Sequence, residues 1–409
     1  MKASAMSKAI LMLVAAAATA SCSSSSSSDA TGGTTMAPIV FTMDATVPAN
    51  GELYQCQLVR LPSTPAAIFV GGGAYETTVG THHFLLFRTS LTTPGSMPLD
   101  TPIDCFEGDG VMKYERGYVS GGQLPKETAD FPAGLALPFH GGDILLMQAH
   151  FLNAGAKDVA SSVRVELHPV PATSVTSHVG TFRFYDPYIY VAPRSASAAG
   201  MRCHLHNDVT LITAGSHMHK RGVEYKAFAD KSGEPMATEP FFTTTDWQHP
   251  PYFKGPLVLP KGSDIRFECH YKNDSDSTFI QGLSAETNEM CMFSAFYAPA
   301  QDDDEDNCVT MDEHGTGAAS CAQTSSCLEL CPASDRPDFS QGSAAVGQCW
   351  QQCIAASCPN VTETLFPQLT CMNDKCKAEC ASAGAACTAC AVTNCKSQVD
   401  ACQARACSN

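Results

Sequence analysis

The run Ile144-Leu145-Leu146-Met147 decides the fold class, because it is short and apolar and follows the turn-forming residues Gly141-Gly142-Asp143. Runs of the same kind recur between residues 37 and 299, namely Phe84-Leu85-Leu86-Phe87, Val209-Thr210-Leu211-Ile212 and Ile265-Arg266-Phe267-Glu268. Gly, Pro, Asn and Asp separate the runs, and long helical periodicity is absent. The region is therefore predicted to be mainly β, built from antiparallel sheets packed as jelly-roll-like sandwiches.

A Pro-rich break, His168-Pro169-Val170-Pro171-Ala172, divides this region into two halves of domain size. The acidic run 302–306 then separates it from a tail of different composition, and it reads as a solvated linker, with a calcium site as the alternative. We expect one β-sandwich over residues 38–176, a second over residues 177–310, and a small disulfide-rich α-helical module over residues 311–409.

The tail is unusually rich in cysteine, with 14 of the 21 cysteines of the chain. Three pairs have the i, i+4 spacing that puts both sulfurs on one helical face: Cys327/Cys331, Cys349/Cys353 and Cys376/Cys380. Two antiparallel helices with such pairs can be bridged twice, which stabilises a hairpin too small to fold on its own core. Disulfides are expected for all 14 tail cysteines, with metal clustering as the alternative, and the connectivity stays open.

The composition excludes several classes of protein. The chain of 409 residues has 25 Lys and Arg against 41 Asp and Glu, a formal charge of −16, so its surface repels nucleic acid. Apolar residues make up 44% and charged residues 16%, which excludes wholesale disorder. The cysteine content is typical of proteins outside the cytosol.

The N-terminus agrees with export. Lys2 and Lys8 precede a short apolar run, residues 9–18, and residues 1–21 as a whole resemble a signal peptide. Cys22 and the serine tract after it resemble the lipidated cysteine and tether, residues 22–37, of a bacterial lipoprotein. Ordinary signal-peptidase cleavage after Ala20, giving a secreted or periplasmic protein, is the alternative.

Four short segments of the β region carry imidazole or thioether groups. They are Thr81-His82-His83-Phe84-Leu85-Leu86-Phe87, Leu145-Leu146-Met147-Gln148-Ala149-His150-Phe151, Gly215-Ser216-His217-Met218-His219 and Asn288-Glu289-Met290-Cys291. This mixture of ligands suits copper in both of its oxidation states. Hard cations need clustered carboxylates, which the segments lack.

The individual signals differ in strength. His217 and His219 are two residues apart, so on a strand both rings lie on one face and can start a metal site, although a polar strand face is the alternative. His82 and His83 are adjacent and would share a metal only at a bulge or a twisted edge. Taken alone, His150 is typical of a satisfied core residue.

The order of these segments resembles the copper type II ascorbate-dependent monooxygenases, the family of dopamine β-hydroxylase and peptidylglycine α-hydroxylating monooxygenase. The order is His-His, then Gln-x-His, then His-x-His, then Glu-Met-Cys, over residues 41–299. Further matches are Gly262-Ser263-Asp264, Cys269-His270-Tyr271 and Phe296-Tyr297-Ala298-Pro299.

The resemblance implies two mononuclear coppers that face each other across an open cleft between the two sandwiches. The ligands of the electron-storing copper would be His82, His83 and His150. The ligands of the oxygen-activating copper, and the catalytic residues, would be His217, His219 and Met290. Met290 taken alone reads as core filling. Gln148 would lie on the same side of its strand as His150, and simple hydrogen bonding is its alternative role.

The resemblance also implies disulfides in the β region. The pairs would be Cys56–Cys105, Cys203–Cys308 and Cys269–Cys291. With Cys22 set aside, these pairs use every cysteine of the β region, as expected of an exported protein without a catalytic thiol.

Departures from the family limit the substrate. Peptide-amidating members have an Arg two residues before His-x-His, where this chain has Gly215, and they have Asn and Tyr where it has Met292 and Ser294. A glycine-extended peptide is therefore not expected. By spacing alone His204, His206 and His270 could also be ligands, and the family resemblance implies that they lie outside the metal sites. No role is predicted for His140, His168, His178, His249 and His314.

The leading hypothesis is an exported, lipid-anchored copper monooxygenase that uses O2 and ascorbate or another reductant to hydroxylate a small organic substrate. The first alternative is a copper-binding surface protein without turnover. The second is a scaffold whose Cys-rich tail binds a protein partner. A nucleic-acid partner is not expected under any of them.

Overall fold

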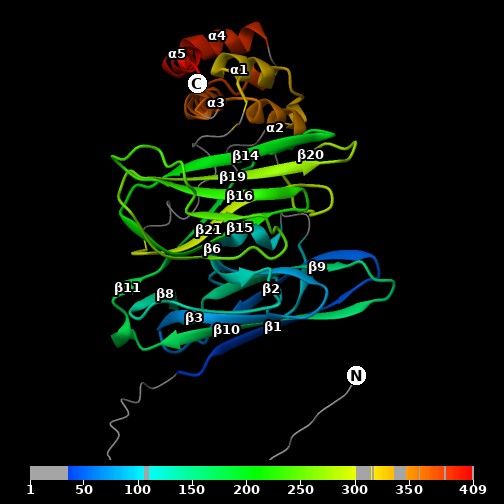
Figure 1. Ribbon diagram of the computed structural model, residues 1–409, viewed down its shortest axis with the longest axis vertical. Coiled ribbons are helices and arrows are strands. Elements are labelled where there is room, and N and C mark those ends of the chain that lie inside the picture. Colours follow the sequence, from blue (N-terminus) through cyan, green and yellow to red (C-terminus); the bar gives the residue numbers. More distant parts are fainter. Residues whose placement is uncertain are drawn as a thin grey trace, which may run out of the picture. The chain divides into compact units, whose positions relative to one another are not determined.

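A computed structural model describes residues 36–105, 110–300, 315, 317–335, 347–358, 360–381 and 384–407. These residues form several antiparallel sheets followed by a helical C-terminal part (Figure 1), so the predicted fold class is confirmed. The predicted signal peptide, the Ser-rich tether and Cys22 lie outside the described residues.

The first sandwich consists of two sheets. One has the order β1-β10-β3-β8-β11 with β7 also on β3, and its strands are β1 (Ile39–Val47), β3 (Ala67–Thr77), β7 (Lys126–Asp130), β8 (Leu135–His140), β10 (Val159–Val170) and β11 (Ser177–His178). The other has the order β5-β2-β9-β4-β6, and its strands are β2 (Gly51–Arg60), β4 (Thr81–Thr89), β5 (Ile103–Asp104), β6 (Glu115–Gly122) and β9 (Ile144–Asn153). Because β11 pairs with β8, the first sandwich includes residues 177 and 178.

Strand β9 explains why the deciding run is continuously apolar. Successive side chains of a strand point to opposite faces. Leu145 and Met147 pack in the core between the two sheets, whereas Ile144 and Leu146 pack in a smaller cluster on the outer face. Both faces of β9 are therefore buried, and the outer face also carries His150.

The second sandwich again pairs two sheets around one core. One has the order β12-β21-β15-β18, with strands β12 (Gly180–Tyr185), β15 (Val209–Met218), β18 (Phe253–Leu259) and β21 (Cys291–Ala298). The other has the order β14-β19-β16-β17, with strands β14 (Ser195–His204), β16 (Gly222–Asp230), β17 (Phe242–Thr244) and β19 (Asp264–Asn273). A short pair, β13 (Tyr190–Val191) and β20 (Phe279–Ile280), lies beside them. Aromatic side chains such as Phe182, Phe267 and Phe293 fill the core.

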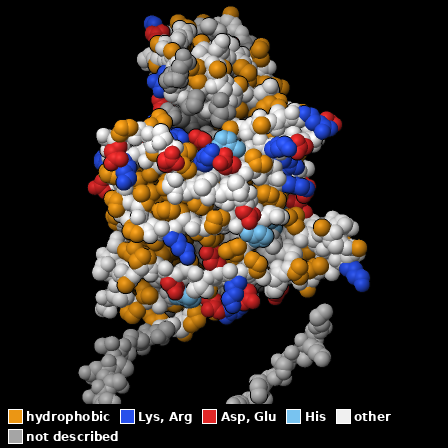
Figure 2. All heavy atoms as spheres, viewed as in Figure 1, with side chains coloured by type: hydrophobic (Ala, Val, Ile, Leu, Met, Phe, Trp, Pro, Cys, Tyr) orange, Lys and Arg blue, Asp and Glu red, His pale blue; other side chains and the backbone are white. Residues whose placement is uncertain are grey.

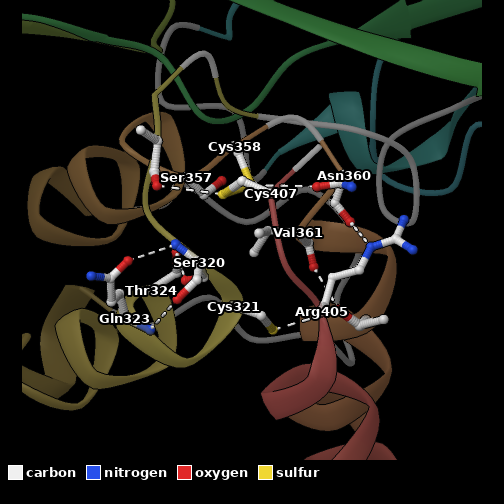
Figure 3. Close-up of a disulfide and its surroundings, with 12 residues drawn as sticks. Ser320, Cys321, Gln323, Thr324, Ser357, Cys358, Asn360, Val361, Arg405 and Cys407 are labelled. Atoms are coloured by element: carbon white, nitrogen blue, oxygen red, sulfur yellow. Dashed lines mark hydrogen bonds between the residues drawn. A yellow bond between two sulfur atoms is a disulfide. The ribbon is translucent and has the colours of Figure 1, made fainter. Parts of the chain in front are cut away.

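The tail forms a helical module. Its helices are α1 (Cys321–Glu329), α2 (Gln348–Ala355), α3 (Thr362–Lys375), α4 (Ala385–Asn394) and α5 (Lys396–Ala404). Ser320 and Gln323 form a capping box at the start of α1, and Arg405 Nε donates to the Asn360 carbonyl beside the Cys358–Cys407 disulfide (Figure 3).

All 14 tail cysteines are disulfide-bonded, as predicted. The bridges are Cys321–Cys402, Cys327–Cys353, Cys331–Cys349, Cys358–Cys407, Cys371–Cys395, Cys376–Cys390 and Cys380–Cys387. The predicted double bridge is present: Cys327 of α1 and Cys331, two residues after its end, pair with Cys353 and Cys349 of α2. Cys376 and Cys380 follow α3 instead of lying on one helical face, and both are bridged to α4. Metal binding by these thiols is therefore excluded in this oxidised state.

Two of the three disulfides expected in the β region are present, Cys56–Cys105 and Cys269–Cys291. Cys203 is disulfide-bonded, and its predicted partner Cys308 lies outside the described residues. This number of disulfides indicates an exported or extracellular protein.

On the face shown in Figure 2, Lys and Arg side chains are interspersed with Asp and Glu. Among the described residues, no helix is both long and apolar enough to span a bilayer.

Candidate metal centre

A bulge in β4 brings three histidines together. Thr81 pairs with Phe151 of β9 and His83 pairs with His150, so His82 is the extra residue between them. A bulge lets neighbouring side chains turn to one side of a sheet. One nitrogen from each of His82, His83 and His150 lies within 4.8 Å of the others. The bulge that His82 and His83 would need in order to share a metal is thus present.

Residues of β2 hold His150 in place. Its Nε2 lies 2.7 Å from Glu52 Oε1, and its ring stacks on Tyr54 with centroids 4.0 Å apart. If Nε2–H donates to the carboxylate, Nδ1 keeps its lone pair for a metal, which is the usual carboxylate–histidine–metal arrangement. Nδ1 of His150 is buried and has no hydrogen-bond partner. His82 Nε2 and His83 Nδ1 are likewise buried without a partner.

The three imidazoles are neutral at ordinary pH. Burial, with the nearby His150, lowers the pKa of His82 to about 4, and burial holds the pKa of His83 well below its usual range. Burial also lowers the pKa of His150, although the hydrogen bond to Glu52 opposes this shift. The same hydrogen bond is the main cause of the lowered pKa of Glu52. Neutral imidazole is the form that binds a metal.

His217 and His219 form a second group at the end of β15. Their ring centroids are 5.1 Å apart. His217 Nδ1 lies 2.8 Å from Gln123 Oε1, and His219 Nδ1 lies 3.2 Å from the Asn288 carbonyl oxygen. With both Nδ1–H groups donating, each Nε2 is left for a metal. Burial holds the pKa of His217 well below its usual range and lowers that of His219 to about 3.

Glu289 fixes the backbone around His219. The fully buried carboxylate accepts from the backbone N–H of His219 at 3.2 Å and of Arg221 at 3.0 Å, and it pairs with the Arg221 side chain at 3.1 Å. Burial nevertheless raises its pKa to about 7. The guanidinium of Arg221 lies over the ring of Phe279, 3.5 Å from its centroid. Glu289 therefore holds the turn after β15 in the position that presents His219.

Met290 lies in the wall of a cavity that His83 and His217 also line. Its carbonyl accepts from Tyr271 Oη at 2.9 Å, and the next residue is anchored through the Cys269–Cys291 disulfide. The backbone of Met290 is thus fixed at its carbonyl and at the following residue. Coordination of a metal by its sulfur stays a prediction.

The two groups of histidines meet, which corrects the expectation of an open cleft between them. The ring centroids of His83 and His217 are 5.4 Å apart. Gln123, which follows β6, joins the two sandwiches: besides its contact with His217, its Nε2 donates to the carbonyls of Trp247 and Gln248, both at 3.1 Å. The Trp247 ring in turn lies 6.0 Å from that of His82. These contacts narrow the expected open cleft to a cavity of about 200 Å³ between the two sandwiches.

The other residues fall as follows. Gln148 is buried in the same cavity wall, and its Nε2 lies 3.3 Å from Met112 Sδ. His204 is half exposed and bonds Asp264, while His270 bonds Glu268, so both have other partners. Neither His204 nor His270 belongs to the three-histidine group.

Sequence reasoning missed Glu52, Gln123 and Asn288. Glu52 and Gln123 lie 98 and 94 positions from the histidines that they contact, and no motif marks them. Glu289 and Asn288 belong to the segment Asn288-Glu289-Met290-Cys291, so that segment was the available signal for them.

The residues present fit copper. A metal about 2.0–2.1 Å from each nitrogen sets nitrogen–nitrogen distances at about 3–4 Å. The nitrogens of the three-histidine group lie within 4.8 Å of one another, which is compatible with that spacing. Four imidazole nitrogens, one each on His82, His83, His150 and His219, are buried without partners, which is costly unless something binds them. Imidazole with a neighbouring thioether is the donor set that copper accepts in both oxidation states.

Comparison with models of known protein families finds no match, and comparison with curated proteins finds none either. Among solved structures, the major capsid protein P2 of bacteriophage PM2 is 8% identical over 64% of this chain and 97% of its own, with a TM-score of 0.24. The N-terminal CBM22-1-CBM22-2 tandem domain of Xyn10C from Paenibacillus barcinonensis is 10% identical over 62% of this chain and 82% of its own, with a TM-score of 0.16. At these TM-scores neither likeness carries an argument.

Proposed function

We propose that the chain is an exported copper-dependent monooxygenase that hydroxylates a C–H bond of a small organic substrate, using O2 and a one-electron reductant such as ascorbate. The observation that carries the proposal is the convergence of five neutral imidazoles from two sandwiches, three of them buried and two partly buried. Four of the five have a buried nitrogen that lacks a partner. Bound copper would supply the one-electron redox chemistry and the activation of O2.

The two groups of residues would have separate tasks. His82, His83 and His150 would hold the electron-storing copper, with Glu52 orienting His150. His217, His219 and Met290 would hold the oxygen-activating copper, with Gln123 and the Asn288 carbonyl orienting the two rings. The aromatic rings of Tyr54 and Trp247 pack against the first group and limit access of water to it.

The proposal includes attachment to a bacterial membrane through a lipid on Cys22, with the serine tract as tether. Cys22→Ala should release the protein from the membrane fraction without altering its copper content. Membrane attachment that survives this substitution would contradict the lipid anchor and leave secretion or periplasmic export.

Copper content and turnover test the central proposal. The purified protein should bind two coppers per chain and show ascorbate-dependent O2 consumption with a hydroxylated product. His217→Ala should abolish product formation and keep the copper of the three-histidine group. Full turnover in this variant would contradict the assignment.

A copper-binding surface protein without turnover is the alternative, and it is favoured by the absence of the family's peptide-gripping residues. A carrier of this kind would bind copper and show no O2 consumption above that of free copper with ascorbate. If the tail instead served as an interaction module, removal of residues 310–409 would abolish localisation and preserve copper binding.

A further inference from the structure

The cavity beside the two histidine groups is small and mostly apolar. Its volume is about 200 Å³, below the usual range for drug-sized ligands. Side chains such as Leu85, Phe87, Met112 and Met292 line it together with His83 and His217. Among the described residues that line it, Arg183 alone carries a full charge, and there is no Asp or Glu.

The sheet places Arg183 on the same face as His217. Arg183 of β12 pairs with Ser294 of β21, and Ser294 pairs in turn with Gly215 of β15. Directly paired residues share a face of a sheet, and His217 shares it because it is two residues after Gly215. Two strand spacings of about 4.8 Å and two residue rises of about 3.4 Å put the Cα atoms of Arg183 and His217 about 12 Å apart.

The hydrogen bonding of Arg183 is incomplete. Its Nη2 donates to Glu115 Oε2 at the start of β6, and its guanidinium lies 5.3 Å from the centroid of the Phe87 ring. Arg183 Nε and Glu115 Oε1 are both buried and have no hydrogen-bond partner. Arg183 is partly buried and keeps an unused donor, and the other side chains that line the cavity carry no full charge. A ligand oxygen can complete the hydrogen bonding of such a guanidinium.

We infer that Arg183 binds the carboxylate of a small, otherwise apolar substrate that extends from Arg183 toward His217. A carboxylate suits the site better than an amine, because the charged side chain that lines the cavity is a cation, and its partner Glu115 does not line the cavity. The planar guanidinium has five N–H donors, so it can bind Glu115 and a ligand carboxylate through different nitrogens. That the bound carboxylate is a substrate rests on the proposed function, whereas the existence of the carboxylate site does not.

This placement replaces the residue that the family resemblance expects at position 215. Gly215 has no side chain, but Arg183 stands at the same level of the same sheet, two strands away. Position 183 therefore lies two strands to the side of position 215 on the same face of the sheet.

Binding to the metal-free protein tests the inference. The probes are 3-phenylpropionate, its neutral amide 3-phenylpropionamide and the cationic 3-phenylpropylamine, measured by calorimetry. The carboxylate should bind about ten-fold more tightly than the amide, as expected for a charge-assisted hydrogen bond. The amine should bind most weakly. Equal binding of the carboxylate and amide, stronger binding of the amine, or no carboxylate binding at millimolar concentrations would overturn the inference.

Three variants assign the preference to Arg183. Glu115→Gln keeps the guanidinium and removes its competitor, so carboxylate affinity should rise. Glu115→Gln combined with Arg183→Met removes the pair without leaving a buried charge, and it should abolish the preference while amide binding persists. Arg194→Met, in an exposed pair with Asp276, is the matched control and should change nothing. Survival of the preference in the double variant would overturn the inference. Because no copper is present, this outcome is independent of turnover.

Discussion

Replacing Glu52 by Gln is expected to weaken metal binding by the three-histidine group. The carboxylate accepts from His150 Nε2 at 2.7 Å and thereby orients the ring and increases the basicity of Nδ1. Removal of such a partner usually lowers metal affinity about 10- to 100-fold, or about 1.4–2.8 kcal/mol. Glu52→Gln keeps an acceptor oxygen and loses the charge, so we expect the lower end of that range. Glu52→Leu also leaves the buried N–H without an acceptor, so we expect the upper end.

The assay is competition for Zn²⁺ between the protein and a chromophoric chelator, because Zn²⁺ reports affinity without redox chemistry. A background of His217→Ala and His219→Ala isolates the three-histidine group. Glu76→Gln is the matched control, since Glu76 is an exposed acid on the same sandwich. An unchanged zinc affinity in Glu52→Leu would refute the reasoning that the carboxylate supports the ligand.

Three further changes have defined outcomes. Gln123→Leu should lower the affinity of the second histidine group about ten-fold, because His217 loses the acceptor that fixes its tautomer; copper titration followed by electron paramagnetic resonance measures this, and an unaltered second site would contradict it. Glu127→Gln should raise the melting temperature at neutral pH, and it should leave the melting temperature unchanged well below pH 4.5. The reason is that burial raises the pKa of Glu127 in the folded protein, so its ionisation costs stability as the pH rises. Thermal unfolding measured at both pH values tests this. Gln351→Ala should destabilise the protein by about 2–4 kcal/mol in urea unfolding, because the buried Gln351 Oε1 accepts from two backbone N–H groups that would lose this acceptor; a loss below about 0.5 kcal/mol would show that other groups replace it.

The elements that depend on local pattern could be predicted from the sequence. Short apolar runs between turn residues predict the strands, and the i, i+4 cysteine pairs predict the doubly bridged helices α1 and α2. The bulge in β4 could be given only as the condition under which His82 and His83 would share a metal, because a sequence does not reveal which residue of a strand is left unpaired. His82 satisfies that condition.

The contacts between the two sandwiches could not be predicted. Gln123 and Glu115 act through partners far along the chain, and a single polar residue at a strand end has no periodicity that marks it. The expected cleft is narrowed to a cavity by the way the two folded domains dock, and no local sequence pattern encodes that docking. Arg183 could not be predicted as part of the site either, because two strand pairings separate it from His217.

The bond from Gln123 to His217 makes the two sandwiches resemble an obligate heterodimer joined by a short peptide. The second sandwich carries its histidines, but one of the groups that prepares them belongs to the first. Separately expressed halves, divided within residues 171–176, would therefore recover the full metal affinity of the second half only after they reassociate. The contact between the two domains therefore contributes to metal binding. A substitution that weakens this contact would lower the metal affinity of the second group although every ligand is still present.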